Sequence, residues 1–236
     1  MRAIDRIRSH TKRMIKIVPG AVNRCLRYVV FTFDLQATFS RRANYVYGDG
    51  DYVRNASLEL AAREIEERGV PGAAAELGVF RGSYAKLINQ AFPARTLYLF
   101  DTFEGFDPKE FHADREQGFI KKADDFTDTS AELVLRKMMY PQNCIVKKGM
   151  FPESSAGMED MFAFVSIDCD LYQPTFAGLT FFWERLSKGG YIFVHDYQNP
   201  LYSGVRAAVR AFCGERGVAY TVMADMCGSA VVAKPL

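Results

Sequence analysis

The sequence of 236 residues has no apolar run that could cross a membrane, because a helical span needs roughly 18 uninterrupted apolar residues. The longest run near the N-terminus, residues 28–31, is interrupted at once by Thr32 and Asp34. The first residues carry charges with no continuous apolar stretch behind them, so we expect no secretory signal. These absences argue against a membrane-spanning or secreted protein.

Cysteine is also sparse and shows no pairing pattern. The five cysteines, at positions 25, 144, 169, 213 and 227, are odd in number and include no Cys-x-x-Cys spacing. A disulfide framework needs paired cysteines, and a zinc ribbon needs closely spaced cysteine pairs. We therefore predict a protein of the reducing cytoplasm.

What is present is the composition of a globular protein, with 49% hydrophobic, 25% charged and 14% aromatic residues, which excludes a disordered or fibrous chain. The net charge of +2 is unevenly distributed. Residues 1–50 hold ten Lys/Arg against three Asp/Glu, and the remainder hold twenty against twenty-five. A nucleic-acid-binding protein would carry its positive charge on the body, so we expect no nucleic-acid partner.

The charge pattern divides the chain into a basic extension, residues 1–45, and a body, residues 46–236. Between residues 4 and 18 apolar side chains recur at helical spacing with Arg and Lys between them, and Pro19-Gly20 ends the pattern. We expect this amphipathic helix to pack on the body or on a second subunit. The alternative is that residues 1–30 lie on an anionic membrane surface.

The body alternates between strand and helix patterns, after a polar, Tyr-rich loop at 39–55. We predict helices at 58–68, 84–90, 129–139, 173–186 and 203–213, and strands at 73–77, 96–100, 144–147, 163–167, 191–194, 219–223 and 229–233. A Thr-Ser-Ala-Glu capping box opens the 129–139 helix. The fold class is α/β, with a mostly parallel sheet covered on both faces and a C-terminal antiparallel hairpin.

Ligands of such sheets bind where the parallel strands end, and the first strand ends in Glu76-Leu-Gly-Val-Phe-Arg-Gly82-Ser83. Gly78 permits a tight turn, and Gly82 permits close approach to a ligand. The middle glycine of the dinucleotide fingerprint is replaced by Phe80. Glu76 would repel a diphosphate but can accept hydrogen bonds from an ammonium. A plain strand–turn–helix junction is the alternative interpretation.

The second strand ends in Asp101, followed by Thr102 and Phe103. An acid about 20 to 25 positions after a glycine turn is placed to hydrogen-bond a ribose diol. Phe103 and Phe106 can form the wall of an adenine site or belong to the core. The combination favours an adenosine-containing ligand, whether a nucleotide or not.

Two later strands also end in acidic residues: Asp168 and Asp170 follow one, and His195 and Asp196 follow the other. Two acids beside a core are costly unless a cation compensates them, which favours a divalent-cation ligand and a second acid with its own task. One acid could instead cap the next helix while the other faces water. His195 is either a metal ligand, a substrate contact or a structural hydrogen-bonding group.

In this order and combination, the motifs resemble the macrocin O-methyltransferase family, which includes the mycinamicin and novobiocin antibiotic-sugar methyltransferases. The resemblance covers roughly residues 45–235 and leaves the first 40 outside. It is carried by Glu76-Leu-Gly-Val-Phe-Arg-Gly82, Phe100-Asp-Thr-Phe-Glu-Gly-Phe106, Phe126-Thr-Asp-Thr-Ser130, Gly149-Met-Phe-Pro152, Asp168-Cys-Asp-Leu-Tyr172, Gly189-Gly190, Asp196-Tyr197 and Gly204-Val-Arg-Ala-Ala-Val209.

The resemblance implies a Rossmann-like class I fold with seven strands, S-adenosylmethionine as methyl donor, Mg²⁺, and a hydroxyl of a sugar, glycan or sugar-bearing small molecule as acceptor. It implies that Asp170 is the general base and that Asp168 and Asp196 bind the metal. The donor-binding residues that it implies are Glu76, Gly78, Gly82, Ser83, Asp101, Thr102, Phe103, Gly149 and Asp168. With the amphipathic extension, it also suggests a homodimer or a higher homo-oligomer.

One position departs from the family pattern, which usually has Asp-Asp-Tyr where this chain has His195-Asp196-Tyr197. A histidine ligand is softer than a carboxylate and shifts metal preference from Mg²⁺ towards Mn²⁺, Fe²⁺ or Zn²⁺. In the implied mechanism, two vicinal hydroxyls of the acceptor bind the metal and become more acidic. Asp170 then takes the proton from the attacking hydroxyl.

Three other functions are compatible with parts of the pattern. A catechol-type acceptor would use the same metal and base. A nucleotide-dependent oxidoreductase would use the same sheet, although the missing glycine and Glu76 argue against it. A non-catalytic binding module would keep the fold alone, and the retained acids argue against that. Tyr- and Phe-rich segments at 45–53 and 103–126 are predicted lids over the acceptor.

Overall fold

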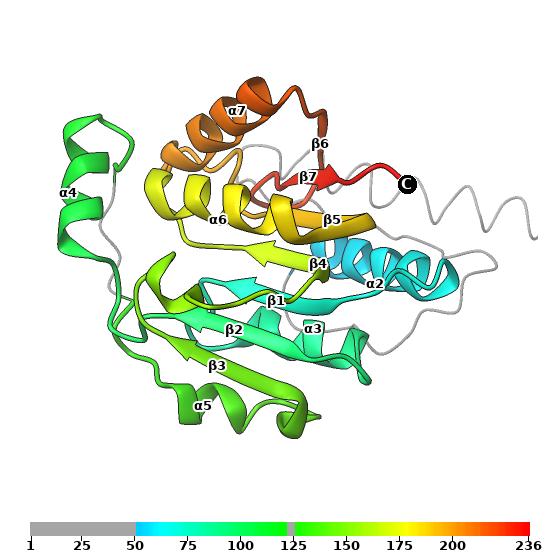
Figure 1. Ribbon diagram of the computed structural model, residues 1–236. Coiled ribbons are helices and arrows are strands. Elements are labelled where there is room, and N and C mark those ends of the chain that lie inside the picture. Colours follow the sequence, from blue (N-terminus) through cyan, green and yellow to red (C-terminus); the bar gives the residue numbers. More distant parts are fainter. Residues whose placement is uncertain (1–50, 122–125) are drawn as a thin grey trace, which may run out of the picture. The chain divides into compact units, whose positions relative to one another are not determined.

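The structure, a computed structural model, describes residues 51–121 and 126–236 (Figure 1). The predicted extension at 1–45, its amphipathic helix and most of the predicted loop at 39–55 lie outside the described residues. Among the helices that are described, none has both the length and the apolar character that crossing a bilayer requires.

The described residues form one seven-stranded sheet in the order β3-β2-β1-β4-β5-β7-β6. Neighbouring strands from β3 to β5 pair in parallel, and β7 pairs antiparallel with both β5 and β6. This confirms the predicted α/β class with an antiparallel C-terminal hairpin. The strands are β1 (Ala73–Leu77), β2 (Leu97–Asp101), β3 (Cys144–Lys148), β4 (Phe162–Ile167), β5 (Leu186–Val194), β6 (Tyr220–Val222) and β7 (Ala230–Ala233).

Helices cover both faces of the sheet, and each face has its own core. Along β1, Ala74 packs into the core beneath α2, α3 and α5, whereas Ala75 and Leu77 pack into the core beneath α6 and α7, as the alternation of side chains along a strand requires. Figure 1 shows α4 beyond the carboxyl ends of the strands. The helices are α2 (Tyr52–Glu67), α3 (Ser83–Ala91), α4 (Pro108–Glu116), α5 (Ala131–Leu135), α6 (Tyr172–Arg185) and α7 (Gly204–Arg216), with 3₁₀ turns at Pro141–Asn143 and Glu153–Ser155.

The start of α2 differs from the prediction, which placed residues up to 55 in a loop. The Asp51 carboxylate accepts hydrogen bonds from the backbone N–H groups of Val53 (2.9 Å) and Arg54 (3.2 Å) and thereby caps the helix. Asp51 also accepts a hydrogen bond from the backbone N–H of Met226, in the segment between β6 and β7. The first turn of α2 is therefore held against that segment.

The boundaries of α5 and β5 also differ from the prediction. The N-cap of α5 is Ser130 and not Thr129, because the Ser130 hydroxyl accepts a hydrogen bond from the Leu133 N–H (3.1 Å), and the helix ends at Leu135. Strand β5 begins at Leu186, directly after α6, instead of at residue 191.

Helix α4 is absent from the sequence-based prediction, although its first residues carry helix signals. The Asp107 carboxylate accepts hydrogen bonds from the backbone N–H groups of Lys109 and Glu110, and Pro108 occupies the first helical position. Only Asp114 of this helix is buried. The apolar periodicity that identifies most helices is therefore missing from it.

The strand hydrogen bonds continue past the strand ends and align the residues that follow them. The backbone N–H of Gly78 donates to the Phe100 carbonyl (2.9 Å), and that of Asp168 donates to the Leu77 carbonyl (2.8 Å). The backbone N–H of His195 donates to the carbonyl of Ile167 (2.9 Å). The residues after β1, β4 and β5 therefore lie side by side at one edge of the sheet.

Candidate active site

A cavity of about 420 Å³ opens at this edge. It is lined by all the predicted site residues except Gly82 and Phe103. Gly82 instead begins α3 in the left-handed conformation (φ +74°), in a place where a side chain would press on Val134. Phe103 is buried in the core with Val134. Neither residue lines the cavity, and a donor contact at these two positions remains a prediction.

Asp101 fixes the turn after β1. Its Oδ2 accepts hydrogen bonds from the backbone N–H groups of Val79 and Phe80, each at 2.7 Å. Its Oδ1 accepts one from the backbone N–H of Phe103, also at 2.7 Å. Phe80 (φ +47°) and Phe103 (φ +56°) have left-handed backbones, which are costly for a residue with a side chain. Asp101 therefore holds two strained residues in place, Phe80 in the cavity lining and Phe103 in the core.

Glu76 projects from β1 into the cavity and is only 1% exposed. Its Oε2 is buried and has no hydrogen-bond partner among the described residues. Burial, and the nearby Asp168 carboxylate, raise the pKa of Glu76 well above its usual range. A buried carboxyl group without a partner is costly, so this position suits a ligand with a cationic hydrogen-bond donor.

The carboxyl groups of Asp168, Asp170 and Asp196 converge, with one oxygen from each within 4.8 Å of the others. Asp170 (φ +61°) and Asp196 (φ +58°) reach this arrangement with left-handed backbones. Burial raises the pKa of Asp170 well above its usual range, and the neighbouring Asp168 and Asp196 add to the effect. The three acids therefore form a compact group whose ionisation calls for a cation.

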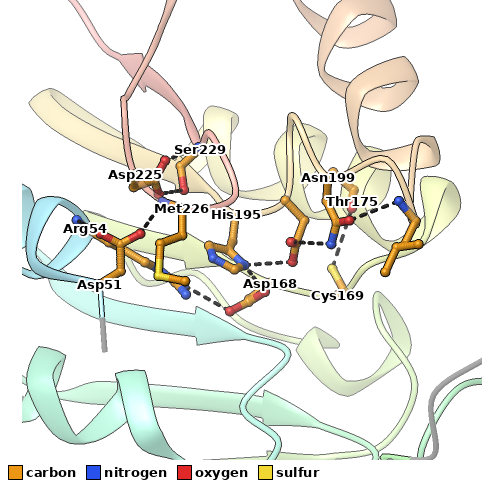
Figure 2. A network of polar contacts seen from close by, with 12 residues as sticks. Asp51, Arg54, Asp168, Cys169, Thr175, His195, Asn199, Asp225, Met226 and Ser229 are labelled. Atoms are coloured by element: carbon orange, nitrogen blue, oxygen red, sulfur yellow. Dashed lines mark hydrogen bonds and ion pairs between the residues drawn. The ribbon is translucent and has the colours of Figure 1, made fainter. Parts of the chain in front are cut away.

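The ring of His195 contacts two of these acids, and Figure 2 shows it beside Asp168. Its Nδ1 is 3.0 Å from Asp168 Oδ1 and 2.7 Å from Asp196 Oδ2. Burial favours the neutral ring, but the attraction and hydrogen bonding of Asp168 outweigh it and raise the pKa of His195 to about 12. Asn199 donates to the other oxygen of Asp196 (2.8 Å). The Sγ atom of Cys227 also lies within 4.8 Å of a ring nitrogen of His195 and a carboxylate oxygen of Asp196.

Arg54 reaches the site from α2, although it is not among the site residues predicted from the sequence. Its Nη2 donates to Asp168 Oδ2 at 2.9 Å, and its guanidinium lies 3.7 Å from the centre of the Tyr84 ring. Although burial opposes it, the attraction of Arg54 and His195 lowers the pKa of Asp168 below its usual range. The capping residue Asp51 was the sequence signal that Arg54 belongs to a helix. No local signal pointed to the contact of Arg54 with Asp168, because the two residues are 114 positions apart.

The arrangement around His195 fits a divalent cation. In an octahedral ion with bonds of about 2.1 Å, neighbouring ligand atoms lie about 3.0 Å apart. The distances from His195 Nδ1 to Asp168 Oδ1 (3.0 Å) and to Asp196 Oδ2 (2.7 Å) are close to that value. The two distances are compatible with a metal in place of the proton on Nδ1. Among the described residues, the triplets whose ligand atoms all lie within 4.8 Å of one another are Asp168, Asp170 and Asp196, and His195, Asp196 and Cys227, so the predicted set shares two members with each.

Several aromatic side chains line the cavity. Phe126 makes edge-to-face contacts with Phe80 (5.2 Å between ring centres) and with Phe106 (5.0 Å). The Tyr202 ring centre lies 6.1 Å from that of Phe106, and both Tyr202 and Glu110 also line the cavity. The predicted lid at 103–126 thus contributes side chains to the cavity, and residues 122–125 lie outside the described chain.

Comparison with known proteins agrees with this architecture. A family model described as Macrocin-O-methyltransferase (TylF) matches residues 50–231. Demethyldecarbamoylnovobiocin O-methyltransferase of Streptomyces niveus is 25% identical over 156 residues, which are 61% of this chain and 60% of that protein. The chain thus spans 60% of the length of this curated relative.

Two solved structures share the fold. The O-methyltransferase NovP has a TM-score of 0.65 at 22% identity, covering 78% of this chain and 80% of its own. CalS11, a calicheamicin methyltransferase, has a TM-score of 0.60 at 21% identity, covering 75% and 77%. Because the family model matches residues 50–231, most of the sequence, the chain belongs to the macrocin O-methyltransferase family.

Proposed function

We propose that this chain transfers a methyl group from S-adenosylmethionine to a hydroxyl group of a sugar or of a glycosylated small molecule. The observation that carries this proposal is the convergence of Asp168, Asp170 and Asp196 at the same cavity that Glu76 and the Gly78 turn line. One part of the cavity suits a cationic donor, and the other suits activation of a hydroxyl.

The donor binds along the ends of β1 and β2. Glu76 accepts hydrogen bonds from the donor's ammonium group, and the Gly78 turn with Ser83 leaves room for its chain. The ends of β2 and β3, at Asp101, Thr102 and Gly149, face the ribose. The Asp101 carboxylate already accepts three hydrogen bonds from backbone N–H groups. A carboxylate has about four lone-pair sites, so Asp101 binds the ribose through the one that is left.

The acceptor hydroxyl binds at the acidic group. Asp170 is the general base, because it lies beside Asp168 and Asp196 but is outside the set spaced around His195. Asp168, His195 and Asp196 would hold a divalent ion, either Mg²⁺ or a softer ion such as Mn²⁺. Such an ion makes hydroxyls more acidic and fixes their orientation. Asp170 receives the proton of the attacking hydroxyl.

Methyl transfer requires the oxygen, the methyl carbon and the sulfur to lie in line, and holding them so removes several kcal/mol of barrier. Asp168 contributes to this alignment from both sides, because Arg54 and His195 fix its two oxygens. The aromatic wall of Phe80, Phe106 and Phe126 excludes water from the reacting groups.

The acceptor class is inferred from the relatives, one of which is described as a TDP-rhamnose 3'-O-methyltransferase. The aromatic side chains in the cavity lining favour a catechol as the second candidate acceptor. We further propose that the enzyme is cytoplasmic and acts as a homo-oligomer, with residues 1–30 packing on a second subunit or contacting a membrane surface.

The proposal is tested by measuring transfer of a labelled methyl group from S-adenosylmethionine to a panel of sugars, glycosides and catechols. Asp170→Asn should lower turnover by roughly 10²- to 10⁴-fold while titration calorimetry shows unchanged binding of S-adenosylhomocysteine. Full activity of Asp170→Asn would show that Asp170 is not the general base. Binding of NAD(H) in place of S-adenosylhomocysteine would replace the whole proposal with an oxidoreductase.

A further inference from the structure

Arg54 and Glu76 place a guanidinium and a carboxyl group against the same cavity. The Arg54 side chain is 12% exposed and Glu76 is 1% exposed, so both groups are held largely out of water. Each influences the other, since Arg54 opposes the rise in the pKa of Glu76 that burial causes. A ligand that presents both an anionic and a cationic group would match this pair.

The guanidinium of Arg54 is held in a fixed position. Asp168 accepts a hydrogen bond from Nη2 (2.9 Å), and the ring of Tyr84 lies against the guanidinium plane at 3.7 Å from its central carbon. A guanidinium has five N–H groups, and the ion pair with Asp168 uses Nη2 alone. The planar fork of Arg is well suited to bind a second carboxylate.

Glu76 supplies the complementary half. Its Oε2 is buried, lacks a partner among the described residues and belongs to a residue that lines the cavity. The amino-acid end of S-adenosylmethionine carries one ammonium and one carboxylate group on the same carbon. The pair Glu76 and Arg54 therefore offers one acceptor and one donor for these two groups.

We propose that Arg54 binds the carboxylate of the methyl donor while Glu76 binds its ammonium. This inference rests on the proposed donor pocket and adds a residue from α2 to it. Because Arg54 also binds Asp168, it links the donor's amino-acid end directly to the acids that bind the acceptor. Arg54 is thus a donor-binding residue that also positions Asp168.

The test compares two ligands that differ only in the carboxylate: S-adenosylmethionine and decarboxylated S-adenosylmethionine. Their dissociation constants are measured by titration calorimetry, without acceptor, for the wild type, Arg54→Gln, Arg54→Lys and a control, Arg68→Gln. Arg68 lies at the other end of α2 and pairs with Glu64 on the surface. Thermal unfolding of each variant confirms that it is folded before the binding data are compared.

We expect Arg54→Gln to weaken S-adenosylmethionine binding by roughly tenfold or more and to change binding of the decarboxylated ligand by less than about twofold. Arg54→Lys should fall between the wild type and Arg54→Gln for S-adenosylmethionine, and Arg68→Gln should match the wild type. Equal weakening of both ligands would overturn the inference, because Arg54 would then act through Asp168 alone. No weakening of either would also overturn it. Failure of the wild type to bind either ligand would instead reject the proposed function.

Discussion

The backbone of Asp168 passes so close to Gly78 that a Cβ on residue 78 would overlap the Asp168 carbonyl oxygen. Gly78 also has a φ of +84°, a conformation that favours glycine. The turn after β1 and the first of the three converging acids are thus in direct backbone contact. Any residue other than glycine at position 78 must move Asp168.

Gly78→Ala should therefore destabilise the protein by about 2 kcal/mol or more and abolish detectable binding of S-adenosylhomocysteine. Gly214→Ala is the matched control, because Gly214 lies in α7 with nothing within 4 Å of an added Cβ. That change should stabilise the protein by roughly 0.5–1 kcal/mol. Urea unfolding and calorimetry measure both effects, and normal binding by Gly78→Ala would contradict the described contact.

Asp101→Asn should loosen the wall of the donor pocket. Both carboxylate oxygens accept hydrogen bonds from backbone N–H groups, and an amide offers only one oxygen, so at least one buried N–H loses its acceptor. We expect a loss of about 1–3 kcal/mol in the free energy of unfolding and weaker binding of S-adenosylhomocysteine. Denaturant titration with and without ligand measures both. An unchanged midpoint would show that Asp101 does not support the turn.

Replacing His195 by the family's usual residue should change the metal preference. His195→Asp makes the ligand set entirely oxygen-based, so the ratio of Mn²⁺ or Zn²⁺ affinity to Mg²⁺ affinity should fall by roughly tenfold. Calorimetric titration of the metal-free protein with each ion gives the ratio. Cys227→Ser is the control that separates the contribution of the neighbouring thiol. A ratio that His195→Asp leaves unchanged would remove His195 from the ligand set.

Glu110 gives the stability a pH dependence. Burial, with the nearby Asp107, Asp114 and Glu153 carboxylates, raises the pKa of Glu110 to about 7. In the unfolded chain a glutamate titrates near about 4.3, so the folded state binds the proton more tightly. The stability that this adds at low pH is lost as the pH rises to about 7.

Glu110→Gln should therefore raise the free energy of unfolding at pH 8 by about 1 kcal/mol, after allowance for solvent screening, and leave it unchanged at pH 4. Urea unfolding at the two pH values measures this. Glu215→Gln, an exposed position in α7, is the control and should show no such difference. Equal effects of Glu110→Gln at both pH values would show that the carboxyl group titrates normally.

The sheet and the convergence of the acids could be predicted because both follow from the local pattern of strands and the residues that end them. Short apolar runs identify buried strands, and parallel strands end at the same edge, so Asp168 and Asp196 had to meet once the β-α alternation was recognised. The departure at His195 was also visible in the sequence, although its distances to both acids were not.

The rest depends on contacts between distant segments. Arg54 belongs to the site only because its partner Asp168 is brought to it by folding, and Phe103 is core because α5 covers it. Helix α4 was missed for a different reason. Only Asp114 of this helix is buried, so its sequence lacks the periodic apolar residues that indicate a helix. Its capping signals at Asp107 and Pro108 were present but short.

The most direct test of the central claim is calorimetric titration of the wild-type protein with S-adenosylhomocysteine and, separately, with NADH. The account predicts one S-adenosylhomocysteine bound per chain, with an affinity that falls in Glu76→Gln, and no binding of NADH. Binding of NADH without S-adenosylhomocysteine, or S-adenosylhomocysteine binding that is unaffected by Glu76→Gln, would contradict it.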